Sequence, residues 1–324
     1  MGTNKSRRNL LLMSQERTQG LVSREEYWET FREVARELKS MAELQESTGT
    51  KILLENGEIL VDMQTSRTHK SSMEMFLNSE DLRSMPFSIL ADGHYEPFQA
   101  DLLIELGKRS KQFIDIGANT GYYSIALAME NKDLEVFSFE PQLDVHNLLQ
   151  RNVTRNDLGD RVVALNVALG EEQSIKNMFV PKFTGTVGAS FKNLHEEEGN
   201  ASVVTVEVKK LDDLIKTRID LIKIDVEGYE SSVLRGSERL INQYQPTIMV
   251  ELLRKWMKPF NTTPQDFLQK MLGYGYICFS ISSNTLFRIE EINDETIETN
   301  FIFVHQENRS HLEFLKGEID QSGK

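Results

Sequence analysis

The stretch that most constrains the fold is residues 111–128, which read KQFIDIGANTGYYSIALA. Residues 113–116 form a short apolar run, mostly β-branched or aromatic, which predicts a buried strand. Residues 117–121 have the composition of a tight turn, and the residues from Tyr122 onward have the spacing of a helix packed on a sheet. A strand, a glycine turn and a helix N-terminus form a corner that binds nucleotides, because the glycines let the ligand approach and the free N–H groups of the helix face it.

The spacing of the glycines and one acidic residue distinguish between nucleotide ligands. Dinucleotide enzymes use G-x-G-x-x-G and place a pyrophosphate on the helix end, whereas Gly117 and Gly121 are four apart with no third glycine in register. Asp115 lies in the approach to the turn. Its charge would repel a pyrophosphate but suits S-adenosylmethionine, which carries a sulfonium and an ammonium. The alternative is an ordinary strand–turn–helix with Asp115 as an N-terminal cap, and a glycine turn alone does not exclude it.

Length and composition narrow the class of protein. The chain has 324 residues, a length that is enough for one large α/β domain plus an accessory segment, and 27% of its residues are charged. A net charge of -13 disfavours nucleic acid as the main partner, because phosphate binding needs a basic face. The single cysteine, Cys278, excludes an internal disulfide and fits a reducing compartment, and its apolar surroundings predict a buried structural thiol. No run approaches the roughly 20 apolar residues of a membrane span. We therefore expect a soluble cytoplasmic protein that does not engage a membrane.

The N-terminal part predicts an accessory segment over residues 21–84, after a disordered stretch at residues 1–20. Apolar residues recur at helical spacing over residues 25–44, which predicts an amphipathic helix. That helix either mediates a homodimer or docks on its own catalytic domain, and the pattern slightly favours docking. Asn56-Gly57 between two apolar runs predicts a hairpin over residues 51–63, and the polar residues 64–81 predict a loop.

From residue 98 onward, strands alternate with helices, which predicts a parallel, doubly wound α/β sheet. The expected strands are residues 113–116, 135–140, 161–169, 220–225, 247–252, 276–281 and 300–304. The expected helices are residues 98–106, 122–129, 143–155, 231–243 and 264–273. Residues 171–210 break the rhythm and predict an antiparallel β insert, and residues 306–324 predict a charged tail.

Polar residues stand at the ends of the second and third of these strands. Glu140 follows Asp115 by about 25 residues, where an acid can accept hydrogen bonds from ribose hydroxyls; it can equally cap the next helix. Asn166 can line an adenine pocket or cap its own strand.

Further acids stand at the ends of the fourth and fifth strands. Asp225, Glu227 and Glu251 should face the same crevice as Asp115, because ligands of open α/β sheets lie beyond the carboxyl ends of the strands. Lys223 lies inside a strand and is expected to pair with one of these acids, since burying it unpaired would be costly. The acids would suit magnesium or calcium, but the six histidines show no zinc spacing and we predict no metal site.

Six segments in this order resemble the FkbM-like family of S-adenosylmethionine-dependent methyltransferases. They are FIDIGANTGYYS, VFSFEPQ, LNVALGE, VEVKKLDDLI, DLIKIDVEGYESSVLRGSERLI and PTIMVEL, and they run from about residue 95 to residue 252. The resemblance implies a Rossmann-like class I methyltransferase sheet of seven strands, mostly parallel, with the last strand antiparallel. It also implies O-methylation of hydroxyls on sugars or natural products.

The resemblance also implies roles for individual residues. Asp225 and Glu227 fall in an acidic motif near the reacting methyl group. The implied cofactor contacts are Glu96, Asp115, Gly117, Ala118, Asn119 and Gly121 around the loop, Glu140 at the ribose, Asn166 beside the adenine, and Asp225.

The sequence therefore predicts an O-methyltransferase with its catalytic domain at residues 85–308 and a charged tail at residues 309–324. S-adenosylmethionine would be the donor, S-adenosylhomocysteine the product, and a hydroxylated small molecule the acceptor. Asp225 or Glu227 would be the general base, with Asp225 preferred because a strand end is the more rigid mount. Two alternatives stay open: a divalent metal held by Asp225, Glu227 and Glu251 assists the reaction, or the domain binds the cofactor without catalysis.

Overall fold

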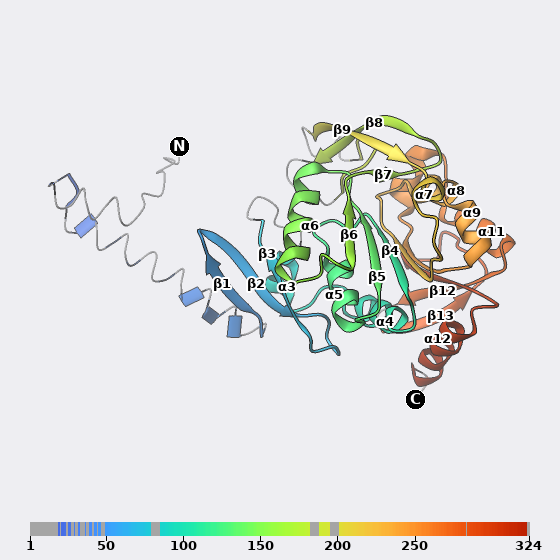
Figure 1. Ribbon diagram of the computed structural model, residues 1–324, viewed down its shortest axis with the longest axis horizontal. Helices are drawn as coiled ribbons and strands as arrows, with labels where there is room; N and C mark the ends of the chain where they lie inside the picture. Colours follow the sequence, from blue (N-terminus) through green and yellow to red (C-terminus); the bar gives the residue numbers. More distant parts are fainter. Residues whose placement is uncertain are drawn as a thin grey trace.

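The computed structural model describes residues 49–78, 85–181, 188–194, 201–282 and 284–322, together with scattered positions between 19 and 46 (Figure 1). The predicted disorder at residues 1–20 lies almost wholly outside the described residues. Most of the predicted helix at residues 25–44 lies outside them too, although the positions described there are helical.

The centre of the fold is an eight-stranded sheet in the order β13-β12-β14-β11-β10-β4-β5-β6 (Figure 1). Its strands are β4 (Gln112–Ile116), β5 (Glu135–Phe139), β6 (Val162–Leu165), β10 (Leu221–Ile224), β11 (Thr247–Glu251), β12 (Tyr276–Ser282), β13 (Thr285–Ile289) and β14 (Asn300–His305). Strands β6, β5, β4, β10 and β11 are parallel neighbours, whereas β14 runs antiparallel to β11 and β12. The predicted mostly parallel sheet with an antiparallel last strand is confirmed, and β13 adds an edge strand that the sequence analysis did not anticipate.

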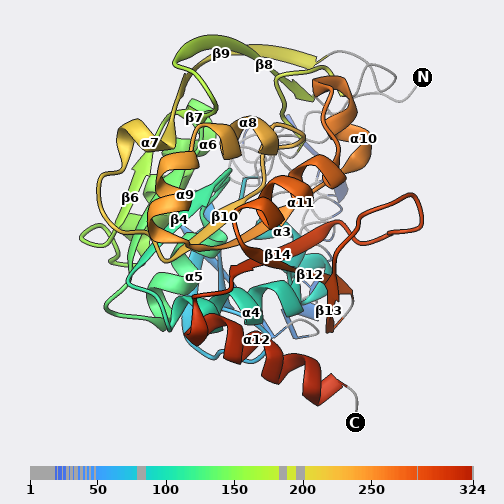
Figure 2. The ribbon, with the colours of Figure 1, turned by 90° about the vertical axis from the view of Figure 1, so that its right-hand side faces the viewer.

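Helices cover both faces of the sheet, so its central strands are mostly apolar, with Asp115 in β4 and Lys223 in β10 as buried charged residues. One core packs beneath α4 (Pro97–Gly107), α5 (Tyr122–Glu130) and α6 (Leu143–Arg155). The other packs beneath α7 (Leu211–Leu214), α8 (Glu230–Arg235), α9 (Glu238–Tyr244) and α11 (Pro264–Gly273), the side that Figure 2 views. Short elements complete this part of the chain: α3 (Phe87–Asp92), α10 (Arg254–Met257) and η2 (Lys258–Phe260).

Two predicted elements are interrupted. The strand expected at residues 161–169 splits, because β6 stays in the central sheet while β7 (Ala168–Leu169) pairs with β9 (Ala201–Lys209). Strand β9 also pairs antiparallel with β8 (Ser174–Pro181), which confirms the predicted β insert as a separate three-stranded sheet. The single helix expected at residues 231–243 is wrong: it breaks into α8 and α9 at Gly236, where a Cβ would lie 1.9 Å from the carbonyl oxygen of Gly170.

The N-terminal hairpin is confirmed as β1 (Lys51–Glu55) and β2 (Glu58–Gln64). Asn56 and Gly57 have φ of 52° and 83°, as a two-residue hairpin turn with two left-handed residues requires. The loop expected at residues 64–81 is wrong in part, because β3 (Ser72–Phe76) pairs with β2 and buries Met73 and Met75. The N–H of Phe76 donates to Oδ1 of Asn152, so the edge of β3 is bonded to α6 of the catalytic part.

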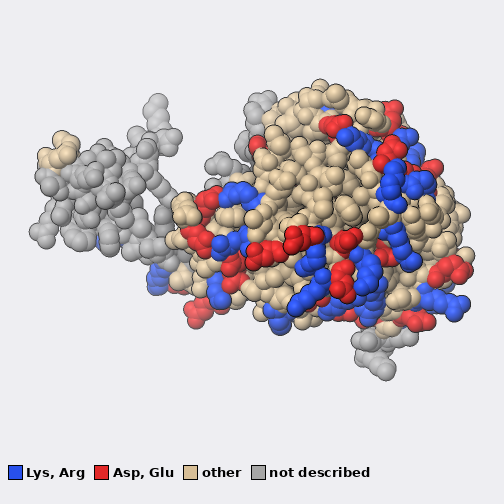
Figure 3. All heavy atoms as spheres, in the orientation of Figure 1, with Lys and Arg blue, Asp and Glu red and all other residues tan. Residues whose placement is uncertain are grey.

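The C-terminal charged tail is also wrong as a description of its structure. Residues 309–322 form helix α12 (Arg309–Ser322), which buries Leu312 and Leu315 against the core beneath α4 and α5. Cys278 is fully buried in β12, as predicted. Among the described residues, no helix combines the length and the apolar composition that crossing a bilayer requires. On the face shown in Figure 3, acidic and basic side chains are interspersed.

Candidate active site

The glycine turn after β4 lies against the end of β10. Gly117, Asn119 and Gly121 have φ of 77°, 48° and 95°, in the left-handed region that favours glycine and tolerates asparagine. A Cβ at Gly117 would lie 1.9 Å from the carbonyl oxygen of Asp225. Only glycine therefore fits at Gly117, and the close approach fixes the turn relative to Asp225.

The backbone N–H groups of the turn are all bonded within the protein. They donate as follows: Gly117 and Ala118 to the Phe139 carbonyl at 3.0 Å each, Asn119 to Oε2 of Glu140 at 3.1 Å, Thr120 to Oδ1 of Asn119 at 2.8 Å, and Gly121 to the Ala118 carbonyl at 2.9 Å. In dinucleotide sites such N–H groups are directed at the pyrophosphate. Here a carboxylate, two backbone carbonyl oxygens and the side-chain oxygen of Asn119 take them instead, so the turn is not prepared for a phosphate.

Asp115 lies beneath the turn rather than in the lining of the cavity described below. It is 1% exposed, and its Oδ2 accepts a hydrogen bond from Ser124 at 2.6 Å, while Oδ1 has no hydrogen-bond partner in the described part of the chain. Burial raises the pKa of Asp115, against the opposing effect of the nearby Lys223 ammonium. The predicted contact of Asp115 with a ligand stays a prediction, since the carboxylate supports the turn from below.

Glu140 accepts a backbone hydrogen bond at the start of the next helix, and its contact with a ribose stays a prediction. Its Oε1 accepts the N–H of Gln142 at the start of α6, and its Oε2 accepts the N–H of Asn119. Burial raises the pKa of Glu140 to about 7. A carboxylate has about four lone-pair sites, so two hydrogen bonds leave acceptor capacity for a ligand hydroxyl.

Asn166 holds the loop after β5 rather than facing the cavity. Its amide donates to the carbonyl oxygens of Glu140 and Pro141 at 3.0 and 2.9 Å. The next two residues, Val167 and Ala168, line the cavity in the position that the sequence analysis gave to Asn166.

Lys223 pairs with Asp225, as predicted, at 3.0 Å from Nζ to Oδ2. Burial lowers the pKa of Lys223, but Asp225, Asp115 and Glu96 together raise it above its ordinary value. The ammonium also lies 5.2 Å from the ring centre of Tyr123, a cation–π distance. One buried cation is thus shared among several carboxylates.

Glu96 lies close to this ion pair without lining the cavity. Its Oε2 accepts a hydrogen bond from the Tyr123 hydroxyl, and burial raises its pKa. Tyr95, Tyr122 and Tyr123 line the cavity, and the rings of Tyr95 and Tyr122 meet edge to face at 5.4 Å. The predicted Glu96 cofactor contact stays a prediction.

The acidic motif after β10 is crowded with carboxyl groups. Glu227 accepts the N–H of Gly188 at Oε1, at 3.1 Å, whereas its buried Oε2 has no partner in the described part of the chain. Burial, followed by the charges of Asp225 and Glu251, raises the pKa of Glu227 to about 9. Burial likewise raises the pKa of Glu251 to about 8. At neutral pH these two groups hold protons, which makes them hydrogen-bond donors rather than bases.

These elements enclose a cavity of about 130 Å³ at the carboxyl ends of the parallel strands, called here the central cavity. Its residues include every predicted site residue except Glu96, Asp115, Gly121 and Asn166. The sequence analysis missed its apolar walls: Met85, Tyr95, Tyr122, Tyr123, Phe139, Val167, Ala168, Met178, Phe191 and Tyr229. Only Tyr122 and Tyr123 carried a usable signal, because they directly follow the turn. No three His, Cys, Asp or Glu side chains in the described ranges are grouped to hold a metal ion.

A doubly wound sheet with an apolar cavity that carries carboxyl groups at its first glycine turn defines the class of open α/β domains that bind ligands beyond the carboxyl ends of their strands. The family model "Methyltransferase FkbM domain" matches residues 115–278, about half of the chain. The chain belongs to this family of methyltransferases, as its sequence motifs indicated.

Two curated relatives are fungal methyltransferases. Methyltransferase sdnD of Sordaria araneosa is 31% identical, over 38% of this chain and 59% of the relative. Methyltransferase 1 of Beauveria bassiana is 29% identical, over 38% of this chain and 57% of the relative. The chain thus spans less than two thirds of the length of either relative. A solved structure, Methyltransferase FkbM from Methylobacillus flagellatus, is 20% identical with a TM-score of 0.39, covering 60% of this chain and 43% of that chain.

Proposed function

We propose that the protein transfers a methyl group from S-adenosylmethionine to a hydroxyl of a small molecule, sugar or natural product, and releases S-adenosylhomocysteine. The observation that carries the proposal is the glycine turn, whose five N–H groups are bonded internally to Phe139, Glu140 and the turn itself. Such a turn offers a phosphate nothing, while the carboxylates around it favour a positively charged ligand.

The residues of the central cavity fit this cofactor. Glu140 has acceptor capacity for two ribose hydroxyls, and Phe139, Val167 and Ala168 offer apolar surface to an adenine ring. Asp225 places a carboxylate in the same cavity, next to where a sulfonium would be stabilised, and the protonated Glu227 beside it can donate a hydrogen bond. When bound, the cofactor supplies an electrophilic methyl group.

We assign Asp225 as the general base that accepts the proton of the acceptor hydroxyl. Its Oδ2 is held by Lys223 at 3.0 Å, and the approach of Gly117 fixes its backbone, so its orientation is set before any ligand binds. Glu227 is already protonated at neutral pH because of its raised pKa of about 9. Asp225 would accept the proton of the acceptor hydroxyl, help that is typically worth about 100- to 10,000-fold. Orientation of the acceptor would remove a further part of the barrier, roughly 7–11 kcal/mol in favourable cases.

The test is methyl transfer from S-adenosylmethionine carrying a labelled methyl group to a panel of hydroxylated acceptors. Wild type should label at least one acceptor, and Asp225→Asn should bind S-adenosylhomocysteine but lose most turnover. Asp133→Asn removes the same charge from an exposed position paired with Lys111, and should behave as wild type. Near-normal methylation by Asp225→Asn would remove the assignment of the base.

Association of two chains through the helix at residues 25–44 stays a prediction, since most of that helix lies outside the described residues.

A further inference from the structure

A second cavity, of about 220 Å³, lies next to the central cavity and shares two of its walls. Tyr95 and Tyr122 line both cavities. Besides the two tyrosines, the polar side chains of the second cavity are Thr50, Gln64, Ser66, Arg67 and His94, contributed by the N-terminal segment and the loop before α4. None of its described lining residues is acidic, although the chain as a whole has a net charge of -13. The second cavity therefore differs from the central cavity, whose lining carries the carboxyl groups of Glu140, Asp225 and Glu227.

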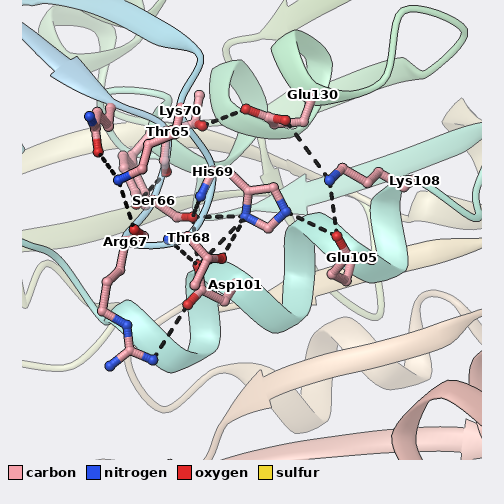
Figure 4. A network of polar contacts seen from close by, with 12 residues as sticks. Thr65, Ser66, Arg67, Thr68, His69, Lys70, Asp101, Glu105, Lys108 and Glu130 are labelled. Carbon is pink, nitrogen blue, oxygen red and sulfur yellow. Dashed lines mark hydrogen bonds and ion pairs between the residues drawn. The ribbon is translucent and has the colours of Figure 1, made fainter. Parts of the chain in front are cut away.

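The loop that carries Arg67 is held rigidly on the catalytic part of the chain (Figure 4). His69 lies between two acids of α4, with Nε2 at 3.0 Å from Glu105 and Nδ1 at 3.6 Å from Asp101. Thr65 donates to Glu130 of α5 at 2.7 Å, and its carbonyl oxygen accepts the Tyr122 hydroxyl at 2.9 Å. These contacts join the loop to both helices and to one of the shared walls, so the second cavity is preformed.

Asp101 of α4 accepts its hydrogen bonds from residues of this loop other than Arg67. Its Oδ1 accepts the hydroxyls of Ser66 and Thr68 at 2.6 and 2.7 Å. The guanidinium of Arg67 lies 3.6 Å from Oδ2 of Asp101, beyond hydrogen-bond distance, and is 49% exposed. Figure 4 shows the Arg67 side chain extending alongside Asp101. This contact orients the guanidinium and leaves N–H donors for a ligand among the five that a guanidinium carries.

Gln64 adds an oriented donor beside Arg67. The ammonium of Lys70 donates to Oε1 of Gln64 at 2.8 Å and to the Arg67 carbonyl at 3.3 Å. With its oxygen engaged by a cation, the amide of Gln64 has its NH₂ group left for a ligand in the cavity that it lines. A planar guanidinium and an amide donor match the paired oxygens of a carboxylate, phosphate or sulfate.

We propose that the second cavity anchors the methyl acceptor through an anionic substituent bound by Arg67, while the hydroxyl to be methylated reaches the central cavity past the wall that Tyr95 and Tyr122 form between the two cavities. The inference rests on the proposed function and narrows it to acidic acceptors, such as uronates or sugar phosphates. It assigns Arg67 as a specificity-determining residue at a site separate from the cofactor.

The experiment is calorimetry on the full-length protein saturated with S-adenosylhomocysteine, using glucuronate, glucose 6-phosphate and glucose as probes that share one ring. At least one anionic probe should bind about tenfold more tightly than glucose, as one charge-assisted contact provides. Comparison of the two anions then tells whether the cavity takes a carboxylate or a phosphate.

Three variants complete the test. Arg67→Gln should abolish the preference for the anion, Arg67→Lys should retain part of it, and Lys111→Gln, an equal loss of charge at an exposed ion pair, should leave it intact. Thermal unfolding of each variant verifies that it folds. Equal or undetectable binding of charged and neutral probes overturns the inference, as does a preference that survives Arg67→Gln. Loss of S-adenosylhomocysteine affinity in Arg67→Gln would also overturn it, because Arg67 would then belong to the cofactor site. Failure of wild type to bind S-adenosylhomocysteine would instead refute the proposed function.

Discussion

Replacing Gly117 with alanine should damage stability and activity together. The backbone there has φ of 77°, and the added Cβ would lie 1.9 Å from the carbonyl oxygen of Asp225, whereas ordinary contacts begin at 3.4 Å. Left-handed strain costs roughly 1–2 kcal/mol, and forcing a buried contact apart costs about 1–3 kcal/mol more. We therefore expect a loss of about 2–5 kcal/mol in the free energy of unfolding.

The same substitution should slow methyl transfer, because the clash moves the residue that we assign as the base. Restoring an ordinary contact requires a displacement of about 1.5 Å between the turn and Asp225, and a misplacement of about 1 Å can cost on the order of 100-fold in rate.

Substitutions at two other glycines distinguish backbone strain from the steric clash as the cause of the lost stability. Gly57 has φ of 83° but nothing within 4 Å of its Cβ position, so Gly57→Ala measures strain alone, and Gly159→Ala meets neither constraint. Urea unfolding and labelled-methyl transfer of the three variants give the comparison. If Gly117→Ala is as stable as Gly57→Ala and fully active, the reasoning about this contact is refuted.

Three further predictions concern other parts of the molecule. Glu227 has its pKa raised from 4.5 to about 9, so the folded protein keeps a proton that the unfolded chain releases. The free energy of unfolding should fall as the pH rises from about 5 to 9. Thermal unfolding of Glu227→Gln should show a melting temperature that depends less on pH. A pH dependence equal to that of wild type would contradict the raised pKa of Glu227. Exhaustive chelation should leave methyl transfer intact, and a loss restored by magnesium would favour the metal-assisted alternative. Leu315→Ala, in the fully buried part of α12, should cost about 2–5 kcal/mol in urea unfolding, whereas a detached tail would show no loss.

The sequence predicted the parallel sheet well because its strands are buried on both faces. Runs such as FIDI and DLIKID have few alternatives to a central strand, and the helices between them follow. Weaker signals failed where tertiary contacts decide the structure. Strand β3 reads SMEMF, whose alternation is present but whose methionines carry little strand preference. Helix α12 has Leu312 and Leu315 at helical spacing, yet its charges and Gly317 resemble a solvated tail.

The candidate site was predictable only at the strand ends. The acids Glu140, Asp225 and Glu227 occupy the cavity as expected, because the carboxyl ends of parallel strands share one edge. The displacement of Asn166 from the lining was not predictable, since it depends on two hydrogen bonds to backbone carbonyls of another segment. The second cavity joins segments as distant in sequence as Arg67 and Tyr122, which periodicity cannot bring together.

The most direct test of the account is calorimetric titration of the wild-type protein with S-adenosylhomocysteine and, separately, with NAD⁺. The internal bonding of the turn's N–H groups, which leaves no donors for a pyrophosphate, and the Asp225 carboxylate in the cavity predict that S-adenosylhomocysteine binds at one site and that NAD⁺ does not. Binding of NAD⁺ without binding of S-adenosylhomocysteine would contradict the central claim.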